Sequence, residues 1–527
     1  MPEEKFDYVV VGSGSAGGVV AARLSEYPSV SVLLLEAGGE DDVDEIRIPA
    51  AFPSLFKTKW DWNYQTTGQK HLQGRRADWP RMKALGGCSS MNAMIYIRGN
   101  AADYDEWRDA YGATGWGYDD VLPYFRKAEG NTSLSDKYHG TDGPLNVEDR
   151  RWNHELSRAW LESAIASGLK PNNDFNGAEQ DGAGLYQVTC KKGHRWSVAD
   201  AYIRPAMKRP NFTVKTQAFA TKILLEGNRA IGVAYRQGGQ DHTVHANAEV
   251  IVSGGTINSP QLLMLSGIGP GAHLREMGID VAVESPGVGQ NLQDHPVSGL
   301  IHYTKDTTDL IDFNTVGSLL KWKTAGRGPL SSNVAEAGAF FPSRDDLTAP
   351  DIQIHMAPSG FYDNGLHENS RRASTIAVTV VKVHSTGSLK LRSADPTWQP
   401  EIDPAYFDNQ ADMDAMLAGY RRVLETVEIG PYAKFLAEPW MPATSNPSDD
   451  ELIELVGRLA QTLYHPTGTC SMGTTDESVV DPELRVNGVE GLRVADASVM
   501  PRVPRGNTNA PTIMIGEKAA DLIKGAS

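Results

Sequence analysis

The sequence has few cysteines and no long hydrophobic run. Three cysteines, Cys88, Cys190 and Cys470, are spread over 527 residues. They are too few and too scattered for a disulfide framework or a zinc site, so we expect a reducing compartment and no metal centre. No apolar stretch is long enough to span a bilayer, while peripheral contact with a membrane stays open. The first strand pattern starts at residue 6, which leaves no room for a signal peptide, and a cytoplasmic protein is expected.

Basic residues are also in deficit. The 50 lysines and arginines stand against 66 aspartates and glutamates, which gives a net charge of −16. Such a surface repels nucleic acid, so we expect a small-molecule substrate instead. The length predicts a large core and two domains. We find no internal repeat and no low-complexity tract.

The chain opens with the pattern of a βαβ unit. An apolar, β-branched run at Phe6–Val11 predicts a buried parallel strand, and it ends in the glycine-rich segment Gly12–Gly17. A helical pattern follows, and Val30–Leu35 predicts a second strand that delivers Glu36. This order of strand, glycines, helix, strand and acid is typical of dinucleotide binding.

Each residue of this motif has a physical role. Gly12 makes the tight turn, Gly14 lets the backbone approach a pyrophosphate, and Gly17 lets helix and strand pack closely. The helix N-terminus offers unpaired N–H groups and partial positive charge to the phosphates. Glu36 lies where a carboxylate can accept from ribose hydroxyls. The motif alone leaves NAD and FAD open.

Further along, short strands, helices and small-residue segments alternate. Phe212–Thr216, Ala220–Leu225 and Ala230–Tyr235 predict an antiparallel meander, and 249–253 predicts another buried strand. We expect a helix from residue 256 with a capping serine and Pro260 in its first turn. Residues 298–457 carry mixed strands, helical patterns at 411–427 and 449–461, and no phosphate-binding signature. This middle region is interpreted as a substrate domain.

Six segments together resemble the glucose–methanol–choline (GMC) family of FAD-dependent oxidoreductases over nearly the whole chain. They are Gly12–Gly17 with Glu36, Leu85–Asn92, Gly255–Gly269, Gly287–Pro296, Tyr464–Gly473 and Asp496–Pro511. Within the family, the segments 91–99 and 332–338 are most similar to bacterial choline dehydrogenases and alkanol dehydrogenases. The resemblance favours FAD over NAD.

The resemblance implies an α/β fold in which a Rossmann-like FAD-binding domain carries an inserted α+β substrate-binding domain. It divides the chain into an FAD-binding domain at 1–155, 196–297 and 458–527 and a substrate-binding domain at 156–195 and 298–457. It also places the FAD contacts. These are Gly12, Gly14, Ser15, Ala16, Gly17, Glu36, Ala37, Gly86, Gly87, Ser90, Asn92, Ala93, Met94, Ala220, Asp496, Ala497, Asn509, Pro511 and Thr512.

The same resemblance implies the catalytic pair. His465 falls where the family has its catalytic histidine, and a histidine suits a general base because its pKa lies near working pH. Asn509 is placed at the family's second active-site position, where an amide can hydrogen-bond the substrate oxygen but cannot take its proton. Pro511 and Thr512 open the last helix, whose positive end is expected to face the flavin. His295 is interpreted as structural.

Two positions bear on the cofactor linkage and the substrate. Some relatives attach FAD through a histidine where this chain has Met91, so we expect non-covalent FAD. Glu336 corresponds to a glutamate that faces the choline cation in relatives, although relatives with uncharged substrates carry it too. The expected substrate pocket comprises Trp62, Glu336, Leu463 and Tyr464.

The resulting hypothesis is an enzyme that oxidises an aliphatic, benzylic or furanic primary alcohol to the aldehyde. The hydride passes to FAD, His465 takes the hydroxyl proton, and O2 or a quinone-type acceptor takes the electrons. The alternatives left open are a choline dehydrogenase or oxidase, a lyase whose FAD is not redox active, and a non-catalytic flavin-binding protein.

Overall fold

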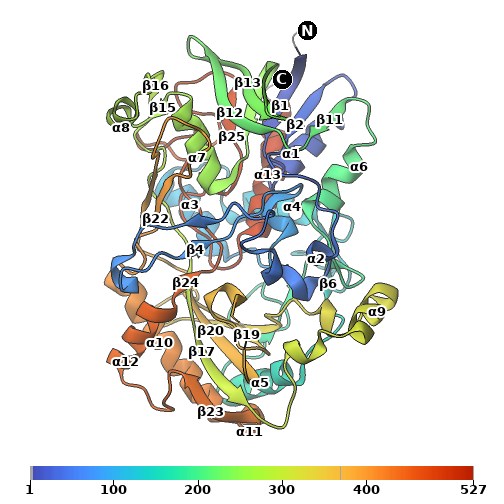
Figure 1. The fold of residues 1–527 in the computed structure, drawn as a ribbon, viewed down its shortest axis with the longest axis vertical. Coiled ribbons are helices and arrows are strands. Elements are labelled where there is room, and N and C mark those ends of the chain that lie inside the picture. Colours follow the sequence, from blue (N-terminus) through green and yellow to red (C-terminus); the bar gives the residue numbers. More distant parts are fainter. Residues whose placement is uncertain (1–3, 368, 526–527) are drawn as a thin grey trace.

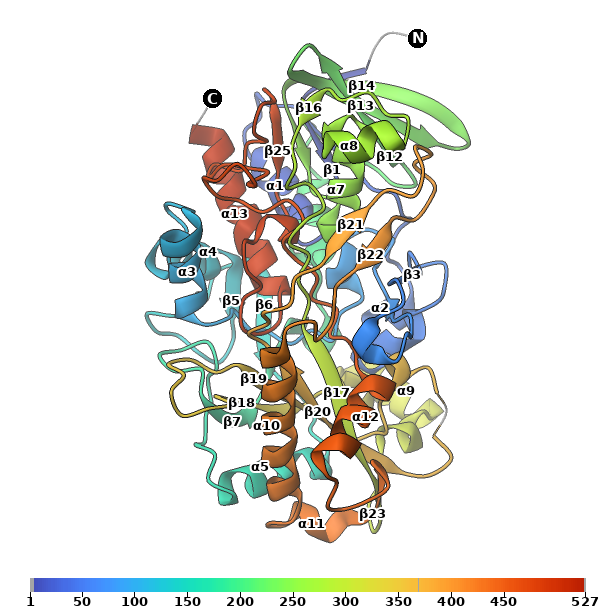
Figure 2. The same ribbon diagram turned by 90° about the vertical axis from the view of Figure 1, so that its left-hand side faces the viewer.

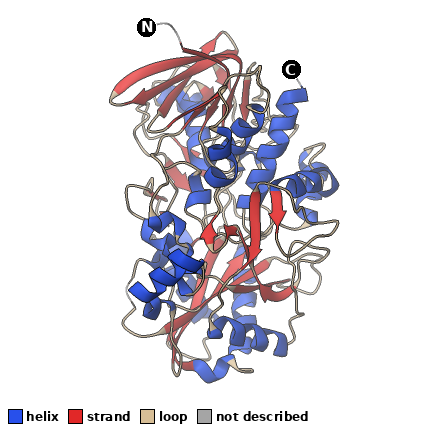
Figure 3. Ribbon diagram, turned by 90° about the vertical axis from the view of Figure 1, so that its right-hand side faces the viewer, coloured by secondary structure: helices blue, strands red, loops and turns tan. Residues whose placement is uncertain are grey.

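The computed structural model describes residues 4–367 and 369–525. Two large β-sheets lie at opposite ends of an elongated molecule, and both described chain ends lie beside the first sheet (Figure 1). Helices pack beside both sheets, and the outer strands at the top of the first sheet carry none on their outer side (Figure 3). The α/β fold class predicted from the sequence is confirmed. No helix within the described ranges is long and apolar enough to cross a membrane.

The first sheet contains the predicted βαβ unit. Its order is β11 (Phe212–Lys215), β2 (Val32–Leu35), β1 (Glu4–Val11), β14 (Gln240–Val252), β13 (Arg229–Gln237) and β12 (Phe219–Glu226), and β25 (Leu492–Val494) also pairs with β14. The end of β1 is buried because its valines pack on both faces of the sheet. The pairs of β1 with β2 and β14 are parallel.

One strand prediction in this sheet is wrong. Strands β12 and β13 form antiparallel pairs as expected, but β11 is not part of that meander. It pairs with β2 in parallel, Phe212 opposite Val32. The short segment between β11 and β12 crosses to the other edge of the sheet, a change of direction that local alternation does not encode.

Helices α1 (Gly17–Leu24) and α13 (Asn509–Gly525) pack against each other beside the first sheet (Figure 2). Arg23 of α1 bonds to the fully buried Glu517 of α13 at 2.8 Å, and Tyr202 donates to the same carboxylate at 2.8 Å. Helix α4 (Tyr118–Ala128) covers the other side of α13. The end of the chain therefore completes the unit that its beginning starts.

Helix α7 (Gly255–Leu265) follows β14 but begins differently from the prediction. No side chain caps it, and its N-cap is Gly254. Ser259 instead donates to Asp496 at 2.5 Å, and Pro260 lies inside the helix. The predicted capping serine is wrong because the N-cap lies five residues before Ser259, directly after the end of the strand.

The second sheet is antiparallel. Its order is β23 (Leu436–Met441), β17 (Pro296–Thr304), β20 (Ala373–Val380), β19 (Ile352–Ala357), β18 (Ala337–Phe341) and β7 (Gly182–Leu185), and β24 (Gln461–Thr462) also pairs with β17. Helices α10 (Gln410–Val427) and α5 (Glu155–Ala166) pack on it. Its other face turns toward the first sheet.

The remaining elements are short or peripheral. The small sheets comprise β3 (Tyr64–Gln65) with β4 (Asp78–Trp79), β5 (Glu129–Asn131) with β6 (Leu145–Asp149) and β8 (Gln187–Val188), β9 (Cys190–Lys191) with β10 (His194–Arg195), β15 (Ile268–Gly269) with β16 (Val283–Glu284), and β21 (Ser388–Lys390) with β22 (Glu401–Asp403). The other helices are α2 (Asp44–Arg47), α3 (Ala101–Tyr111), α6 (Arg204–Ala206), α8 (Gly271–Glu276), α9 (Val316–Ala325), α11 (Tyr432–Phe435) and α12 (Asp449–Leu459). Single 3-10 turns lie at Pro49–Leu55, Lys70–Leu72, Gly87–Ser90, Leu310–Phe313, Pro329–Ser331, Asp363–Gly365 and Ala497–Val499, and a π turn at Ala199–Ile203.

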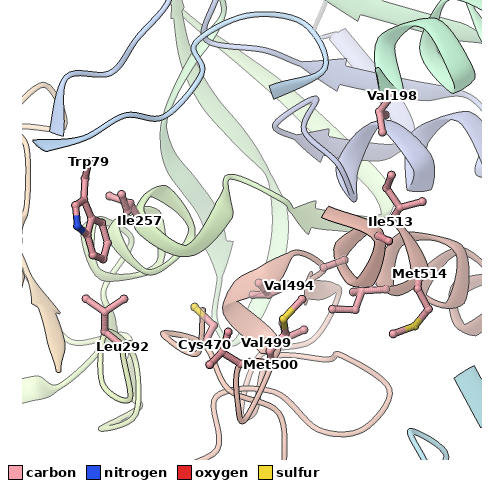
Figure 4. Packing of buried hydrophobic residues seen from close by; sticks show 14 of the residues in the cluster. Trp79, Val198, Ile257, Leu292, Cys470, Val494, Val499, Met500, Ile513 and Met514 are labelled. Atoms are coloured by element: carbon pink, nitrogen blue, oxygen red, sulfur yellow. The ribbon is translucent and has the colours of Figure 1, made fainter. Parts of the chain in front are cut away.

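One hydrophobic core joins distant parts of the chain. Figure 4 shows Trp79 and Ile257 packed near Leu292, while Val499, Met500 and Met514 come from the C-terminal segment. Cys470 is fully buried in this cluster. It serves as a small packing residue, as its surroundings are apolar and burial raises the pKa of its thiol.

Candidate active site

One cavity is lined by both sheets. From the first sheet it takes the turn between β1 and α1 and the end of β14, and from the second it takes residues of β17, β19 and β20. The N-terminal residues of α13 line it as well. Segments from both ends of the sequence therefore meet around one space.

The glycines of the first motif shape one end of the cavity. Gly12 has φ 98°, and a Cβ there would lie 2.3 Å from the Ser253 carbonyl oxygen, so no other residue fits. Beside Gly14 the space is open, since a Cβ would meet only Gly87 Cα, at 4.0 Å. No side chain caps α1, and of its first N–H groups that of Gly18 donates to the Gly14 carbonyl at 3.0 Å, so the others are left for a ligand. This is the geometry of a pyrophosphate cradle.

Glu36 lies beside this turn and lines the cavity. One oxygen accepts from the Ser13 backbone and hydroxyl at 3.1 and 2.5 Å, and the other accepts from the Gly38 backbone at 2.7 Å. Burial raises the pKa of this carboxyl, and the three donors oppose that rise. The fixed carboxylate suits ribose hydroxyls, which can donate to it.

The second glycine-rich segment packs directly on the first. Gly87 has φ 51°, and a Cβ there would lie 2.6 Å from Gly14 Cα. The Gly86 backbone donates to Ser13 at 3.2 Å. Asn92 is held by Arg195 at 2.9 Å and lines the cavity. Met94, also in the lining, has φ 56°, a costly conformation of the kind that gathers at functional sites.

Most predicted cofactor residues line the cavity. They are Gly12, Gly14, Ser15, Ala16, Glu36, Ala37, Gly87, Asn92, Ala93, Met94, Ala220, Asp496, Ala497, Asn509 and Thr512. Four predicted contacts do not line it. Gly17 packs on Gly12, Gly86 forms the turn behind Gly87, Ser90 donates to the Leu85 backbone, and Pro511 is buried in α13. These four act on the shape of the cradle.

His465 lies in the wall at the other end of the cavity and is 7% exposed. Its backbone N–H donates to Asp294 at 2.8 Å, which places the ring. Burial lowers its pKa well below the ordinary value, and the nearby His295, His355 and Arg81 side chains also disfavour a positive charge on its ring. The ring is therefore neutral at neutral pH and has a lone pair for a proton.

The structure corrects the partner of this histidine. Asn507, not Asn509, lies beside it, with Nδ2 3.2 Å from His465 Nε2. Asn509 belongs to the nucleotide end, where Ser15 donates to its side-chain oxygen at 2.7 Å. The motif contains both asparagines two positions apart. Helix α13 begins at Asn509, so Asn507 lies before the helix and Asn509 lies in its first turn.

His295 is not remote from this site. Its Nδ1 lies 3.0 Å from His465 Nδ1, and the two rings meet edge to face. It is fully buried, and burial lowers its pKa to about 3. The structural interpretation of His295 is thus extended, because it contacts the predicted base directly.

The wall around His465 is mainly apolar. Leu463 and Tyr464, which precede His465 in the chain, and Trp62, which packs on Phe219, all line the cavity, and Tyr464 has φ 67°. Sequence reasoning placed none of the remaining lining side chains at this end in the substrate pocket. It considered Met91 only for the cofactor linkage and left open whether Phe52 and Phe56 form a lid. The others are Arg81, Met82, Val334, His355, Ala357 and Phe361. Several of these form one hydrophobic cluster.

Glu336 is wrongly assigned to the substrate pocket. It is fully buried outside the cavity lining, where it accepts from the His154 backbone at 2.7 Å and from Ser332 at 2.6 Å. Burial raises the pKa of its carboxyl, while Ser332 and Arg150 oppose the rise. Its residue type matched the family pattern, but its direction depends on how β18 packs on α5.

One acidic cluster outside the cavity is an ion-pair network. His139 Nδ1 lies 3.0 Å from Glu129, and its Nε2 lies 3.0 Å from Asp174. Burial alone would lower the pKa of His139, but these two carboxylates outweigh it and raise the pKa to about 9. Both ring nitrogens are occupied by carboxylates, so the ring has no lone pair left for a metal ion.

The residues around the nucleotide end fit FAD. A pyrophosphate fits the open cradle at Gly14, the uncapped helix and the second glycine segment. A ribose fits the fixed carboxylate of Glu36. The N-terminus of α13 points at the cavity, which is lined there by Thr508, Asn509 and Thr512. Its partial positive charge suits an electron-rich ring.

Comparisons with known proteins agree with this geometry. A GMC oxidoreductase family model matches residues 6–297, and the C-terminal model of the same family matches 383–516. The chain is 42% identical to mitochondrial choline dehydrogenase of Homo sapiens, over 99% of this chain and 90% of that one. It is 42% identical to an alcohol dehydrogenase (acceptor) of Pseudomonas putida, over 98% and 95%. A solved formate oxidase variant from Aspergillus oryzae RIB40 superposes with a TM-score of 0.93, at 30% identity over 100% and 99%.

Proposed function

Since the chain belongs to the GMC oxidoreductase family of FAD-dependent enzymes that act on CH–OH donors, we propose that its substrate is an uncharged primary alcohol. The product is the aldehyde. The observation that carries this choice is the wall near His465, which is built mainly from aromatic and aliphatic side chains. Of the described lining residues, only Glu36 and Asp496 are acidic, and both belong to the nucleotide end.

A cationic alcohol such as choline would be poorly served by this wall. Burying an ammonium group without a carboxylate is costly, and Glu336, the candidate from the family pattern, is held away from the cavity. Arg81 in the lining adds positive charge. Aliphatic, benzylic and furanic alcohols carry no positive charge, so they neither bury an unpaired ammonium group nor are repelled by Arg81.

The proposed chemistry uses two side chains. FAD, when bound, supplies the acceptor for the hydride from the alcohol carbon. His465 Nε2 holds the hydroxyl group through its lone pair and takes the proton as the carbon–oxygen double bond forms. Asn507 donates from Nδ2 to the same oxygen and stabilises the developing negative charge. The apolar wall excludes water from the reacting carbon.

We propose a cytoplasmic enzyme that passes its electrons to O2 or to a quinone-type acceptor. An oxygen electrode and a ubiquinone analogue, used on the same reduced enzyme, separate the two acceptors. The faster reoxidation rate identifies the acceptor class.

The substrate is tested by anaerobic stopped-flow reduction. Benzyl alcohol, 1-hexanol, hydroxymethylfurfural and choline are mixed with the holoenzyme, and the loss of flavin absorbance is followed. We expect the uncharged alcohols to have higher kcat/KM than choline and His465→Ala to lose the reaction. A higher kcat/KM for choline would contradict the proposed substrate. No bleaching with any alcohol would point to a lyase or a binding protein.

A further inference from the structure

A chain of hydrogen bonds leaves the active site and ends at a backbone carbonyl. Tyr186 donates to the Ile354 carbonyl at 2.6 Å. Gln353 Nε2 lies 3.2 Å from the Tyr186 hydroxyl and 3.2 Å from Asn507 Oδ1. Asn507 Nδ2 then reaches His465 Nε2, whose other nitrogen meets His295.

The direction of this chain is determined by its backbone end. The Tyr186 hydroxyl has one proton, and the Ile354 carbonyl can only accept it. The hydroxyl oxygen must therefore accept a hydrogen bond from Gln353, so the amino group of that amide faces Tyr186. The same amino group also donates to Asn507, which must accept this hydrogen bond with its side-chain carbonyl oxygen. The amino group of Asn507 is left pointing at His465.

The ring of His465 can satisfy this arrangement in only one neutral form. Nε2 accepts a hydrogen bond from Asn507, so it must carry the lone pair. The ring proton then sits on Nδ1 and is donated to His295 Nδ1 at 3.0 Å. His295 is neutral in its buried site and accepts through that nitrogen. The lone pair of the base thus lies on Nε2, the nitrogen beside Asn507, and both residues line the cavity.

We propose that Gln353 is a positioning residue that holds His465 in the tautomer with its basic nitrogen toward the substrate. The inference rests on the proposed function, in which His465 is the base. Gln353 lies on β19, is fully buried and is not part of the cavity lining. It acts through Asn507 and not on the substrate.

Two further observations favour positioning over simple packing. The carbonyl oxygen of Gln353 has no hydrogen-bond partner among the described residues, and a buried polar atom without a partner is costly. An apolar residue at this position would avoid that cost. The useful part of the Gln353 side chain is therefore its amino group, which donates both hydrogen bonds. The Tyr186 hydroxyl also needs a glycine opposite it. A Cβ on Gly338 would lie 2.0 Å from the hydroxyl oxygen.

The test is a pair of substitutions of similar size. Gln353→Glu keeps the shape but, once ionised, can only accept, so Asn507 must turn round and present its oxygen to His465. Nε2 would then carry the proton, and the base would be lost. Gln353→Met removes the amide without imposing a direction. Anaerobic flavin reduction by benzyl alcohol at pH 8 should fall by roughly 10²-fold or more in Gln353→Glu, in line with loss of a general base. Gln353→Met should lose far less.

The pH profile gives the second readout. In Gln353→Glu the rate should rise as pH falls, because the protonated carboxyl can again donate to Asn507, whereas the wild-type rate should not. The titratable groups near this position are Tyr186, whose pKa is raised by burial, and His355, whose pKa burial lowers to about 3. Arg150 bonds to the Tyr186 carbonyl. His465 itself faces His295, His355 and Arg81.

The outcomes separate this inference from the proposed function. Near wild-type reduction in His465→Ala would overturn the base itself, whatever the Gln353 variants do. Equal rates for Gln353→Glu and Gln353→Met at pH 8, with full FAD content, would overturn the positioning role alone. Nitrogen-15 histidine spectra of the wild-type holoenzyme, assigned by the signal missing in His465→Ala, decide the case if a variant does not fold. Protonation at Nδ1 supports the inference, and protonation at Nε2 refutes it.

Discussion

Alanine substitutions at Asn507 and Asn509 should have different effects although the residues are two positions apart. Asn507 Nδ2 lies 3.2 Å from His465 Nε2. Losing one donor to a developing oxyanion costs about 2.7–4 kcal/mol, or roughly 10²–10³ in rate. Asn507→Ala should therefore reduce flavin slowly and still bind FAD. Asn509 accepts one neutral hydrogen bond from Ser15 at 2.7 Å. That bond contributes about 0.5–1.5 kcal/mol.

Asn509→Ala should therefore weaken FAD binding by roughly 2- to 12-fold and leave the reduction rate of the saturated enzyme nearly unchanged. FAD affinity is measured by titrating apo-enzyme with FAD and following flavin fluorescence. The reduction rate is measured by anaerobic stopped flow at saturating FAD, with wild type and His465→Ala as references. A 10²-fold slower reduction in FAD-saturated Asn509→Ala, beside near wild-type reduction in Asn507→Ala, would refute the assignment.

Three further predictions concern linkage, substrate choice and stability. Acid or heat denaturation should release FAD into the supernatant, because Met91 cannot form the histidine link, and flavin absorbance in the pellet would speak against this. Glu336→Gln should leave the ratio of kcat/KM values for choline and benzyl alcohol unchanged in steady-state assays, since Glu336 lies outside the cavity lining; a selective loss with choline would restore it as a cation site. The folded pKa of His139, about 9, exceeds its unfolded value of 6.5, so its contribution is full below pH 6.5 and is lost as pH rises through 9. Urea unfolding should lose up to about 3 kcal/mol across that window, and the loss should be absent in His139→Gln.

The nucleotide half could be predicted because its signals are local. The turn at Gly12 and the carboxylate of Glu36 belong to one short βαβ unit, in which spacing alone determines direction. Family segments then identified FAD, and the matching family models confirm it. The domain boundaries drawn from the sequence remain a prediction.

The substrate end was harder to predict because it depends on how the sheets pack. Glu336 and Gln353 both lie on or beside strands of the second sheet, and neither residue's type reveals which side it faces. Sequence reasoning assigned Asn509 and not Asn507 as the partner of His465 for a similar reason. Where α13 starts decides which asparagine reaches His465, and helix ends are the least certain part of any sequence reading.

The pairing of Arg23 with Glu517 determines when the FAD-binding unit can be completed during synthesis of the chain. The two residues are 494 positions apart in the chain. At a synthesis rate of about 5–20 residues per second, the N-terminal βαβ unit waits roughly 25–100 s before its last helix exists. Until then, one side of α1 lacks its partner, and the segment that brings Asn507 and Asn509 to the cavity has not been made. Cofactor loading is therefore expected to follow the end of translation, and a message truncated near its 3′ end should yield a protein without yellow colour.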